Sequence, residues 1–168
     1  DSDIYLLYPL HYHPEASTSI LCGAYLDEYE VIRNIAFNLP QGVCLYVKDH
    51  LSATGYQSRD FYKRVARLPG VNIICPTVQN KMLIRRSLGV ITLTSTVGYE
   101  ALLLNKPVFL YGEVFYKFHS SIIKIKNPVE LFELVSNSLS GWRAVDYQYN
   151  LDFVCAYFLA TKPGLLNF

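Results

Sequence analysis

The sequence predicts an α/β fold: a Rossmann-like, doubly wound parallel sheet flanked by helices, with about five or six strands. Short apolar segments rich in β-branched residues alternate along the chain with segments whose apolar residues recur at helical spacing. The strand segments are apolar on both faces, which is typical of a parallel sheet covered by helices on either side. We therefore expect residues 1–168 to form a single domain, with residues 142–168 as a C-terminal helical extension.

The first half of the chain predicts three strands and three helices in alternation. The expected strands are Ile4–Leu10, Val43–Val47 and Val71–Cys75, and the expected helices are Tyr25–Leu39, Ser58–Leu68 and Asn80–Ser87. Pro40 and the pair Pro69-Gly70 supply stop signals after the first two helices, since proline cannot continue a helix.

The stretch from Gly89 to Gly112 predicts a compact strand–helix–strand unit. An apolar strand, Val90–Leu93, is followed by the hydroxyl residues Thr94, Ser95 and Thr96, a helix over Tyr99–Leu104, and a strand over Val108–Tyr111. Gly98 lets a backbone or a ligand come close. Because the carboxyl edge of a parallel sheet binds ligands and a helix N-terminus suits an anion, this unit predicts a phosphate site.

The last third of the chain continues the alternation with weaker signals. Ile122-Ile123 is an apolar pair, Pro128 opens a helix that runs to Leu139, and Gly141-Trp142 marks a turn. A final helix is expected over Tyr147–Ala160.

Composition excludes several classes of protein. Hydrophobic residues make up 51% of the chain and aromatic residues 14%, which argues against disorder. Fifteen basic and fourteen acidic residues give a net charge of +1 without single-sign runs, so no nucleic-acid partner is expected. The four cysteines form no C-x-x-C pair, and we find no signal peptide or membrane-spanning run. These features predict a cytoplasmic protein, and the start one step from a strand suggests a domain cut from a longer chain.

Three loops are expected to share the carboxyl rim of the sheet, because parallel strands end at the same edge. Their polar residues are His11, His13 and Glu15 in the first loop, Lys48 and His50 in the second, and Thr94, Ser95, Thr96 and Glu100 in the third. Together they supply hydroxyls and amides for a phosphate, a cationic or imidazole group for charge, and a carboxylate for sugar hydroxyls.

Structural roles compete with each of these assignments. Ser95 and Thr96 could serve only as a helix cap, Glu100 only as a partner of the helix dipole, and His50 only as a solvated loop residue. His11 and His13 have no Cys or Asp at a ligand spacing, so no metal is expected. The pair Arg85-Arg86 fits a solvated helix face better than an anion site. The P-loop and G-x-G-x-x-G patterns are absent.

Three stretches together resemble a known family. YPLHYHPEAST (residues 8–18), LYVKDH (45–50) and TSTVGYEALLLNKPVFLYG (94–112) are similar to the nucleotide-sugar-binding half of capsule and surface-polysaccharide glycosyltransferases. The similarity runs from about Ile4 to Tyr116 and is greatest to bacterial transferases that use CMP-activated Kdo. The resemblance implies one half of the two-Rossmann-domain architecture called GT-B, here the C-terminal donor-binding domain.

Carried over residue by residue, the family's His-Pro motif falls on His50-Leu51, its Ser/Thr motif on Ser95-Thr96 and its ribose-side acid on Glu100. Leu51 stands where the family has proline, so the imidazole is kept while the loop shape that proline fixes is not. The donor-binding set that we expect is His50, Lys48, Ser95, Thr96, Gly98, Glu100, His11 and Glu15.

The resemblance implies a domain that binds a CMP-sugar, is not expected to be catalytic alone, and uses no cofactor and no metal. The catalytic residues and the acceptor site would belong to an N-terminal domain. Membrane association, if any, would be peripheral, at the inner face and through the rest of the protein. The uncovered side is expected to be apolar and aromatic, with Tyr12, Tyr116 and Phe118 as candidates. Two alternatives stay open: a non-catalytic nucleotide or carbohydrate-assembly module, favoured by Leu51, and half of a UDP-sugar transferase or epimerase.

Overall fold

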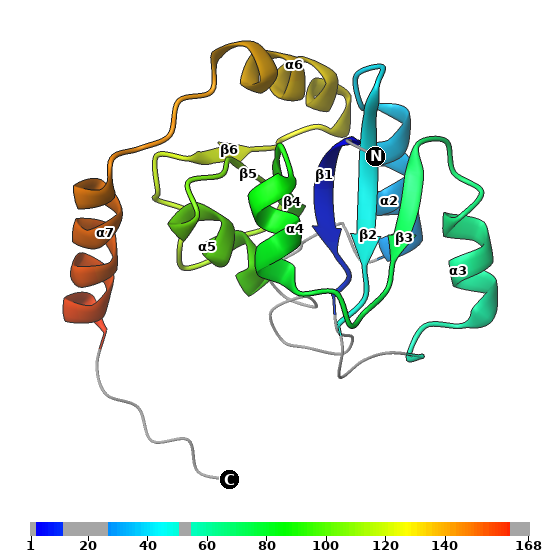
Figure 1. Cartoon of the computed structure of the whole chain (residues 1–168), viewed down its shortest axis with the longest axis horizontal. Coiled ribbons are helices and arrows are strands. Elements are labelled where there is room, and N and C mark those ends of the chain that lie inside the picture. The colour runs from blue at the N-terminus through cyan, green and yellow to red at the C-terminus, as the bar shows by residue number, and fades with distance from the viewer. Residues whose placement is uncertain (1–2, 12–26, 51–54, 162–168) are drawn as a thin grey trace, which may run out of the picture.

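A computed structural model describes residues 3–11, 27–50 and 55–161 of the 168-residue chain. Six parallel strands form one sheet in the order β3-β2-β1-β4-β5-β6 (Figure 1). The strands are β1 (Ile4–Pro9), β2 (Val43–Lys48), β3 (Val71–Ile74), β4 (Gly89–Thr92), β5 (Val108–Leu110) and β6 (Ile122–Lys124). The predicted doubly wound sheet is confirmed, and the apolar pair Ile122-Ile123 proves to be its sixth strand.

The helices lie close to their predicted ranges. They are α2 (Glu28–Phe37), α3 (Arg59–Val65), α4 (Asn80–Arg86), α5 (Thr96–Leu103), α6 (Leu131–Gly141), which follows a 3-10 turn at Pro128–Glu130, and α7 (Tyr147–Ala160). Side chains that accept backbone N–H groups fix several starts, with Asp27 capping α2 and Ser58 capping α3. The start of α5 was predicted three residues too late, because Ser95 rather than Gly98 is the residue before the helix.

Helices cover both faces of the sheet with two separate apolar layers. On one face α2, α3 and α6 pack against the strands, and Ile32 and Ile35 of α2 are fully buried there. On the other face α4 and α5 pack against Tyr5, Leu7 and Val90, with α7 at their edge. Figure 1 shows α4 crossing in front of the sheet and α2 behind it. The apolar runs on both faces of the strands therefore have the cover that the sequence predicted.

Gly98 is needed for a reason that the sequence did not reveal. A Cβ atom on Gly98 would lie 2.5 Å from the hydroxyl oxygen of Tyr116 and 3.2 Å from Cγ2 of Thr92. The close neighbour of Gly98 is thus Tyr116, whereas a ligand or backbone was expected. The expectation that Tyr116 lies on an uncovered side is wrong, because its ring is fully buried. Phe118 is exposed as expected, and Tyr12 lies outside the described residues.

A buried histidine attaches α7 to the rest of the domain. Ser121 N–H donates to Nδ1 of His119 (3.1 Å), so the ring proton lies on Nε2 and points to the Asn150 side-chain oxygen at 2.8 Å. Tyr149 and Phe153 of α7 pack edge-on against the same ring. Asn150 continues the chain of contacts by donating to the side-chain oxygen of Asn105 (2.8 Å). Helix α7 is therefore held by a histidine whose neutral form the hydrogen bonds require.

Acidification is expected to weaken this attachment. Burial lowers the pKa of His119 from its ordinary value of about 6.5. The hydrogen bond to Asn150 raises this pKa, but by less than burial lowers it. The unfolded chain then binds the proton more readily than the folded one, so the free energy of unfolding should fall as the pH drops below about 6.5. Thermal unfolding at several pH values, for the parent and His119→Gln, measures this. Equal slopes between about pH 6.5 and 5 in both proteins would contradict the assignment.

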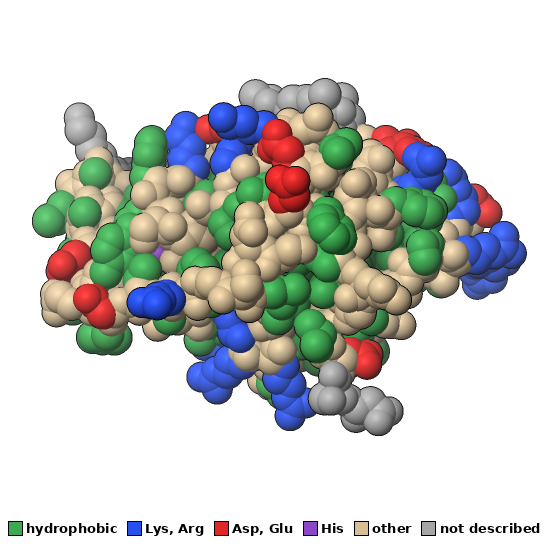
Figure 2. All heavy atoms as spheres, turned by 90° about the horizontal axis from the view of Figure 1, so that it is seen from above, with side chains coloured by type: hydrophobic (Ala, Val, Ile, Leu, Met, Phe, Trp, Pro, Cys, Tyr) green, Lys and Arg blue, Asp and Glu red, His purple; other side chains and the backbone are tan. Residues whose placement is uncertain are grey.

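Charged side chains are dispersed over the surface. Figure 2 views the molecule from above relative to Figure 1 and shows Lys and Arg in several separate groups, with acidic side chains among them. Within the described residues, no helix has both the length and the apolar character needed to cross a bilayer.

Candidate functional site

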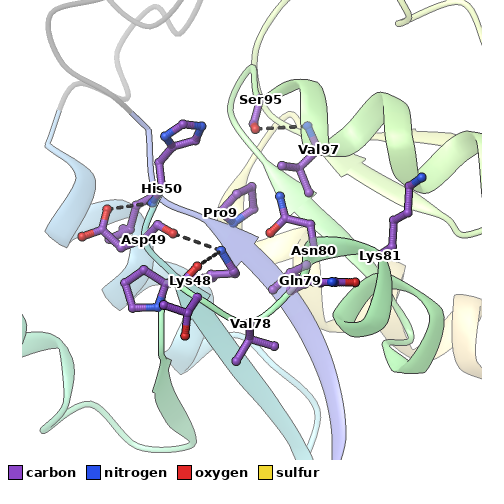
Figure 3. Close-up of a pocket in the computed structure, with 14 residues that line it drawn as sticks. Pro9, Lys48, Asp49, His50, Val78, Gln79, Asn80, Lys81, Ser95 and Val97 are labelled. Carbon is purple, nitrogen blue, oxygen red and sulfur yellow. Dashed lines mark hydrogen bonds between the residues drawn. The ribbon is translucent and has the colours of Figure 1, made fainter. Parts of the chain in front are cut away.

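The strand order places a crevice at the carboxyl ends of β1 and β4. The connections from β1 lead to one side of the sheet and those from β4 to the other, so the loops after these strands diverge. A cavity of about 380 Å³ lies there, which we call the rim cavity (Figure 3). Its lining residues are Leu7, Pro9, Leu10, Lys48, Asp49, His50, Pro76, Thr77, Val78, Gln79, Asn80, Lys81, Ser95 and Val97. Its size is within the range of small-molecule sites.

Lys48 ties two walls of the rim cavity together. It ends β2, is buried, and its Nζ donates to the backbone carbonyls of Asp49 (3.2 Å) and Pro76 (3.0 Å). Burial lowers the pKa of the Lys48 ammonium, while Asp49 opposes that shift. A lysine so placed carries positive charge into the cavity and also holds the loop after β3 against the end of β2.

His50 stands at the exposed lip of the cavity, and Asp49 fixes its backbone. The Asp49 carboxylate accepts the His50 N–H (2.8 Å) and also the hydroxyl of Tyr62 on α3. Burial and the bond to Asp49 raise the pKa of Tyr62 to about 12, so this phenol stays a donor. In Figure 3 the imidazole of His50 projects from the strand end on one side of the cavity, and Ser95 lies on the other.

Ser95 caps the helix that forms the facing wall. Its hydroxyl oxygen accepts the Val97 N–H at 3.2 Å, which confirms the capping role considered from the sequence. Thr96 is the first helical residue and is exposed. The first turn of α5 carries no acidic residue, because Glu100 lies one turn further along. The dipole role considered for Glu100 depended on a first-turn position, and that position is not the one observed.

His11 lies behind this wall in a buried network. Its Nδ1 is 3.0 Å from Glu28 Oε1 on α2, and its Nε2 is 3.1 Å from the Thr92 hydroxyl at the end of β4. Thr94 N–H donates to the same Nε2 (3.3 Å), and Ser95 N–H donates to the Thr92 hydroxyl oxygen (3.0 Å). The network joins the ends of β1 and β4 to the start of α2.

The structure brings together only part of the predicted donor set. Lys48, His50 and Ser95 line the rim cavity, and His11 supports the loop that carries Ser95. The other members on α5, namely Thr96, Gly98 and Glu100, are not among the lining residues. Glu15, together with His13 and Leu51, lies outside the described residues. Arg85 and Arg86 are exposed near the end of α4, as expected of a solvated helix face.

Sequence reasoning missed one wall of the cavity, which the loop after β3 and the first residues of α4 form. This wall contains Thr77, Gln79, Asn80 and Lys81. Since β3 and β4 are separated in the sheet by β2 and β1, the connection through α4 must cross both strands at their carboxyl ends. The polar run after Pro76 was a usable signal once that crossing was considered. Glu28 was also missed, because it lay within the expected helix Tyr25–Leu39 and no role in the site was considered for it.

The charges around the rim cavity favour an anion. Lys48 and Lys81 line it, and α5 directs its positive N-terminal end toward it, while the Asp49 carboxylate is already occupied by two donors. The side-chain amides of Gln79 and Asn80 add neutral donors and acceptors. Among the residues that the structure describes, no three His, Cys, Asp or Glu side chains gather as a metal-binding group. These side chains offer positive charge and hydrogen-bond donors, which suit an anion such as a phosphate.

The sequence of this chain matches a family of known proteins. The sequence model of a family described as "Capsule polysaccharide biosynthesis protein" matches residues 5–120, which contain β1 from its second residue, β2 to β5 and every lining residue of the rim cavity. No curated protein sequence matches the chain.

Solved structures share the fold at low identity. The beta-Kdo 2,7-transferase of Thermosulfurimonas dismutans KpsC is 20% identical with a TM-score of 0.59, over 96% of this chain and 55% of that one. The beta-Kdo 2,4-transferase of the same KpsC is 19% identical with a TM-score of 0.56, over 89% and 43%. The UDP-GlcNAc 2-epimerase of Methanocaldococcus jannaschii is 17% identical with a TM-score of 0.62, over 94% and 45%. The chain thus spans about half the length of these proteins.

Proposed function

The chain belongs to the family of capsule polysaccharide biosynthesis proteins, and we propose that its rim cavity is the donor site of a glycosyltransferase that uses a CMP-sugar of the Kdo type. The observation that carries the proposal is the convergence of Lys48, His50 and the capped start of α5 on one cavity. In this arrangement Lys48 and the N-terminus of α5 neutralise the donor phosphate, and His50 contacts the nucleotide at the lip.

The acceptor would be held by a second domain. Transfer needs the donor and acceptor at near-attack distance, and the rim cavity supplies only positioning and charge for one of them. The chain spans 55% and 43% of the two Kdo transferase chains, which leaves room in such proteins for a facing domain. We propose that this facing domain supplies the acceptor site and the reactive group, so residues 1–168 alone are expected to bind the donor without transferring sugar.

Nucleotide titration tests the proposal directly. We expect residues 1–168 to bind CMP or a CMP-sugar in the high-micromolar to millimolar range, about −4 to −6 kcal/mol, because only one side of the donor is covered. Calorimetric or NMR titration with CMP, UDP and their sugars measures it. If no cytidine nucleotide binds at millimolar concentration, the result would favour the non-catalytic module over a CMP-sugar donor site.

A UDP-sugar site is the second candidate, and it has support from the fold. A UDP-GlcNAc 2-epimerase and Anabaena HepE, the latter solved with UDP and glucose, share this fold with TM-scores of 0.62 and 0.54. HepE is 13% identical over 93% of this chain and 42% of its own. Binding of UDP without CMP in the same titration would select this candidate.

The assignment of Glu100 to the ribose makes a separate prediction. A carboxylate that accepts ribose hydroxyls loses one charge-assisted partner in Glu100→Gln, so we expect CMP to bind about three- to tenfold more weakly. The midpoint of thermal unfolding should change little, because Glu100 is partly exposed and lies beyond the first turn of α5. The parent should prefer CMP to 2′-deoxy-CMP, and the variant should not. A parent that binds both nucleotides equally would remove Glu100 from the site.

A further inference from the structure

Hydrogen-bond geometry assigns one protonation form to the buried ring of His11. Thr94 N–H can only donate, so Nε2, at 3.3 Å, must accept. Since Nε2 then carries no proton, the Thr92 hydroxyl, whose oxygen accepts Ser95 N–H, donates its own proton to the same Nε2 at 3.1 Å. The ring proton therefore resides on Nδ1, where Glu28 Oε1 receives it at 3.0 Å. In this form of the ring, Glu28 receives the Nδ1 proton, while Thr94 N–H and the Thr92 hydroxyl share the one lone pair of Nε2.

Glu28 connects this ring to other segments at the same edge of the sheet. Its Oε1 also accepts the backbone N–H of His11 (2.7 Å) and the hydroxyl of Tyr8 (3.3 Å). Its Oε2 accepts the side-chain amide of Gln57 (3.4 Å), seven residues beyond His50. A buried carboxylate with these partners carries a desolvation cost that well-packed apolar side chains of similar volume avoid. A buried network of this kind is therefore weak evidence for a role in stability.

The network determines the path of the loop that leads into α5. Two successive amides, those of Thr94 and Ser95, are directed inward to His11 and Thr92, so α5 opens at Thr96 beside the rim cavity. We propose that His11 is a positioning residue for phosphate binding: held by Glu28, it keeps this loop in the conformation that receives the donor phosphate. The proposal rests on the donor site proposed above and adds a residue that does not line the cavity.

Two substitutions of His11 distinguish the role of Nδ1 from the role of Nε2. The side chain of His11→Asn can reach the position of Nδ1 and keep the contact with Glu28, but it loses the acceptor for Thr94 N–H. The side chain of His11→Gln can place an oxygen near Nε2 and keep that acceptor. We expect CMP to bind about tenfold more weakly to His11→Asn and less than about threefold more weakly to His11→Gln, the loss expected of one hydrogen bond. Cytidine, which has no phosphate, should bind all three proteins within about twofold, since the change concerns only the phosphate loop.

Amide hydrogen exchange of Thr94 tests positioning independently of any nucleotide. The amide should be protected in the parent and in His11→Gln and should exchange much faster in His11→Asn. If His11→Asn fails to fold, Thr92→Val, which lacks the hydroxyl, should weaken CMP binding as described for His11→Asn, with Thr92→Ser as the matched control that keeps it.

The outcomes that overturn this proposal differ from those that overturn the donor site. Equal loss of CMP and cytidine in His11→Asn, or a Thr94 amide that stays protected in that variant, would overturn the role of His11. A parent that binds neither CMP nor UDP would overturn the donor site, and His11 would then have no phosphate to position.

Discussion

Gly98→Ala is expected to lower the free energy of unfolding by about 1–3 kcal/mol, the usual cost of overpacking a core. The new methyl group would lie 2.5 Å from the Tyr116 hydroxyl oxygen and 3.2 Å from Thr92, inside a fully buried contact. Alanine favours a helix over glycine by about 0.5–1 kcal/mol, so the clash must exceed that gain for the variant to be less stable. Thermal or denaturant unfolding measures the difference, at about 2–4 °C per kcal/mol for a domain of this size.

Tyr116→Phe provides the matched control for this prediction. Removing the Tyr116 hydroxyl relieves the clash with the new methyl group. It also removes the hydrogen bond that this hydroxyl donates to the Ser95 carbonyl oxygen, which keeps the Gly98 N–H as a donor at 3.0 Å. The double variant should therefore be more stable than the sum of the two single changes by at least about 0.5 kcal/mol. Additive effects in the cycle would show that Gly98 is not required by Tyr116.

The fold was predictable from the sequence because its main determinants are local. Strands apolar on both faces, such as Leu6–Tyr8 and Val90–Leu93, have few alternatives to a parallel sheet with helices on either side. Helix α7 was predicted at its observed ends, since Asp146 caps it and Pro163 follows it. The start of α5 was less certain, because three hydroxyl residues in a row could each have been the cap.

The site was only partly predictable, because two of its features depend on distant contacts. The residues Thr77 to Lys81 carry no motif, and only the crossing of α4 over two strands brings them to the rim cavity. The contact between His11 and Thr92 joins residues 81 positions apart, and neither residue identifies the other in the sequence. The local signals, Lys48 with His50 and the hydroxyls before α5, identified three of the lining residues, namely Lys48, His50 and Ser95.

Replacing both Ser95 and Thr96 with Ala is expected to weaken CMP binding by about 1.5–3 kcal/mol, roughly ten- to a hundredfold, the range for hydrogen bonds to a charged group. Ser95 already accepts the Val97 N–H, so loss of the cap alone should cost about 1 kcal/mol of stability. The single variant Thr96→Ala is the control for stability, because Thr96 is exposed and follows the cap.

Affinity and stability together distinguish the two roles of these hydroxyls. If the start of α5 receives the phosphate, the double variant should lose affinity for CMP far more than for cytidine, and Thr96→Ala should lose part of it without a change in stability. If the hydroxyls serve only as a cap, the midpoint of unfolding should fall while the ratio of CMP to cytidine affinity stays constant. Because the Ser95 hydroxyl oxygen already accepts Val97 N–H, the Ser95 hydroxyl can offer a phosphate only its own proton. Calorimetric titration of both ligands at fixed ionic strength, with unfolding followed on the same samples, decides between these outcomes.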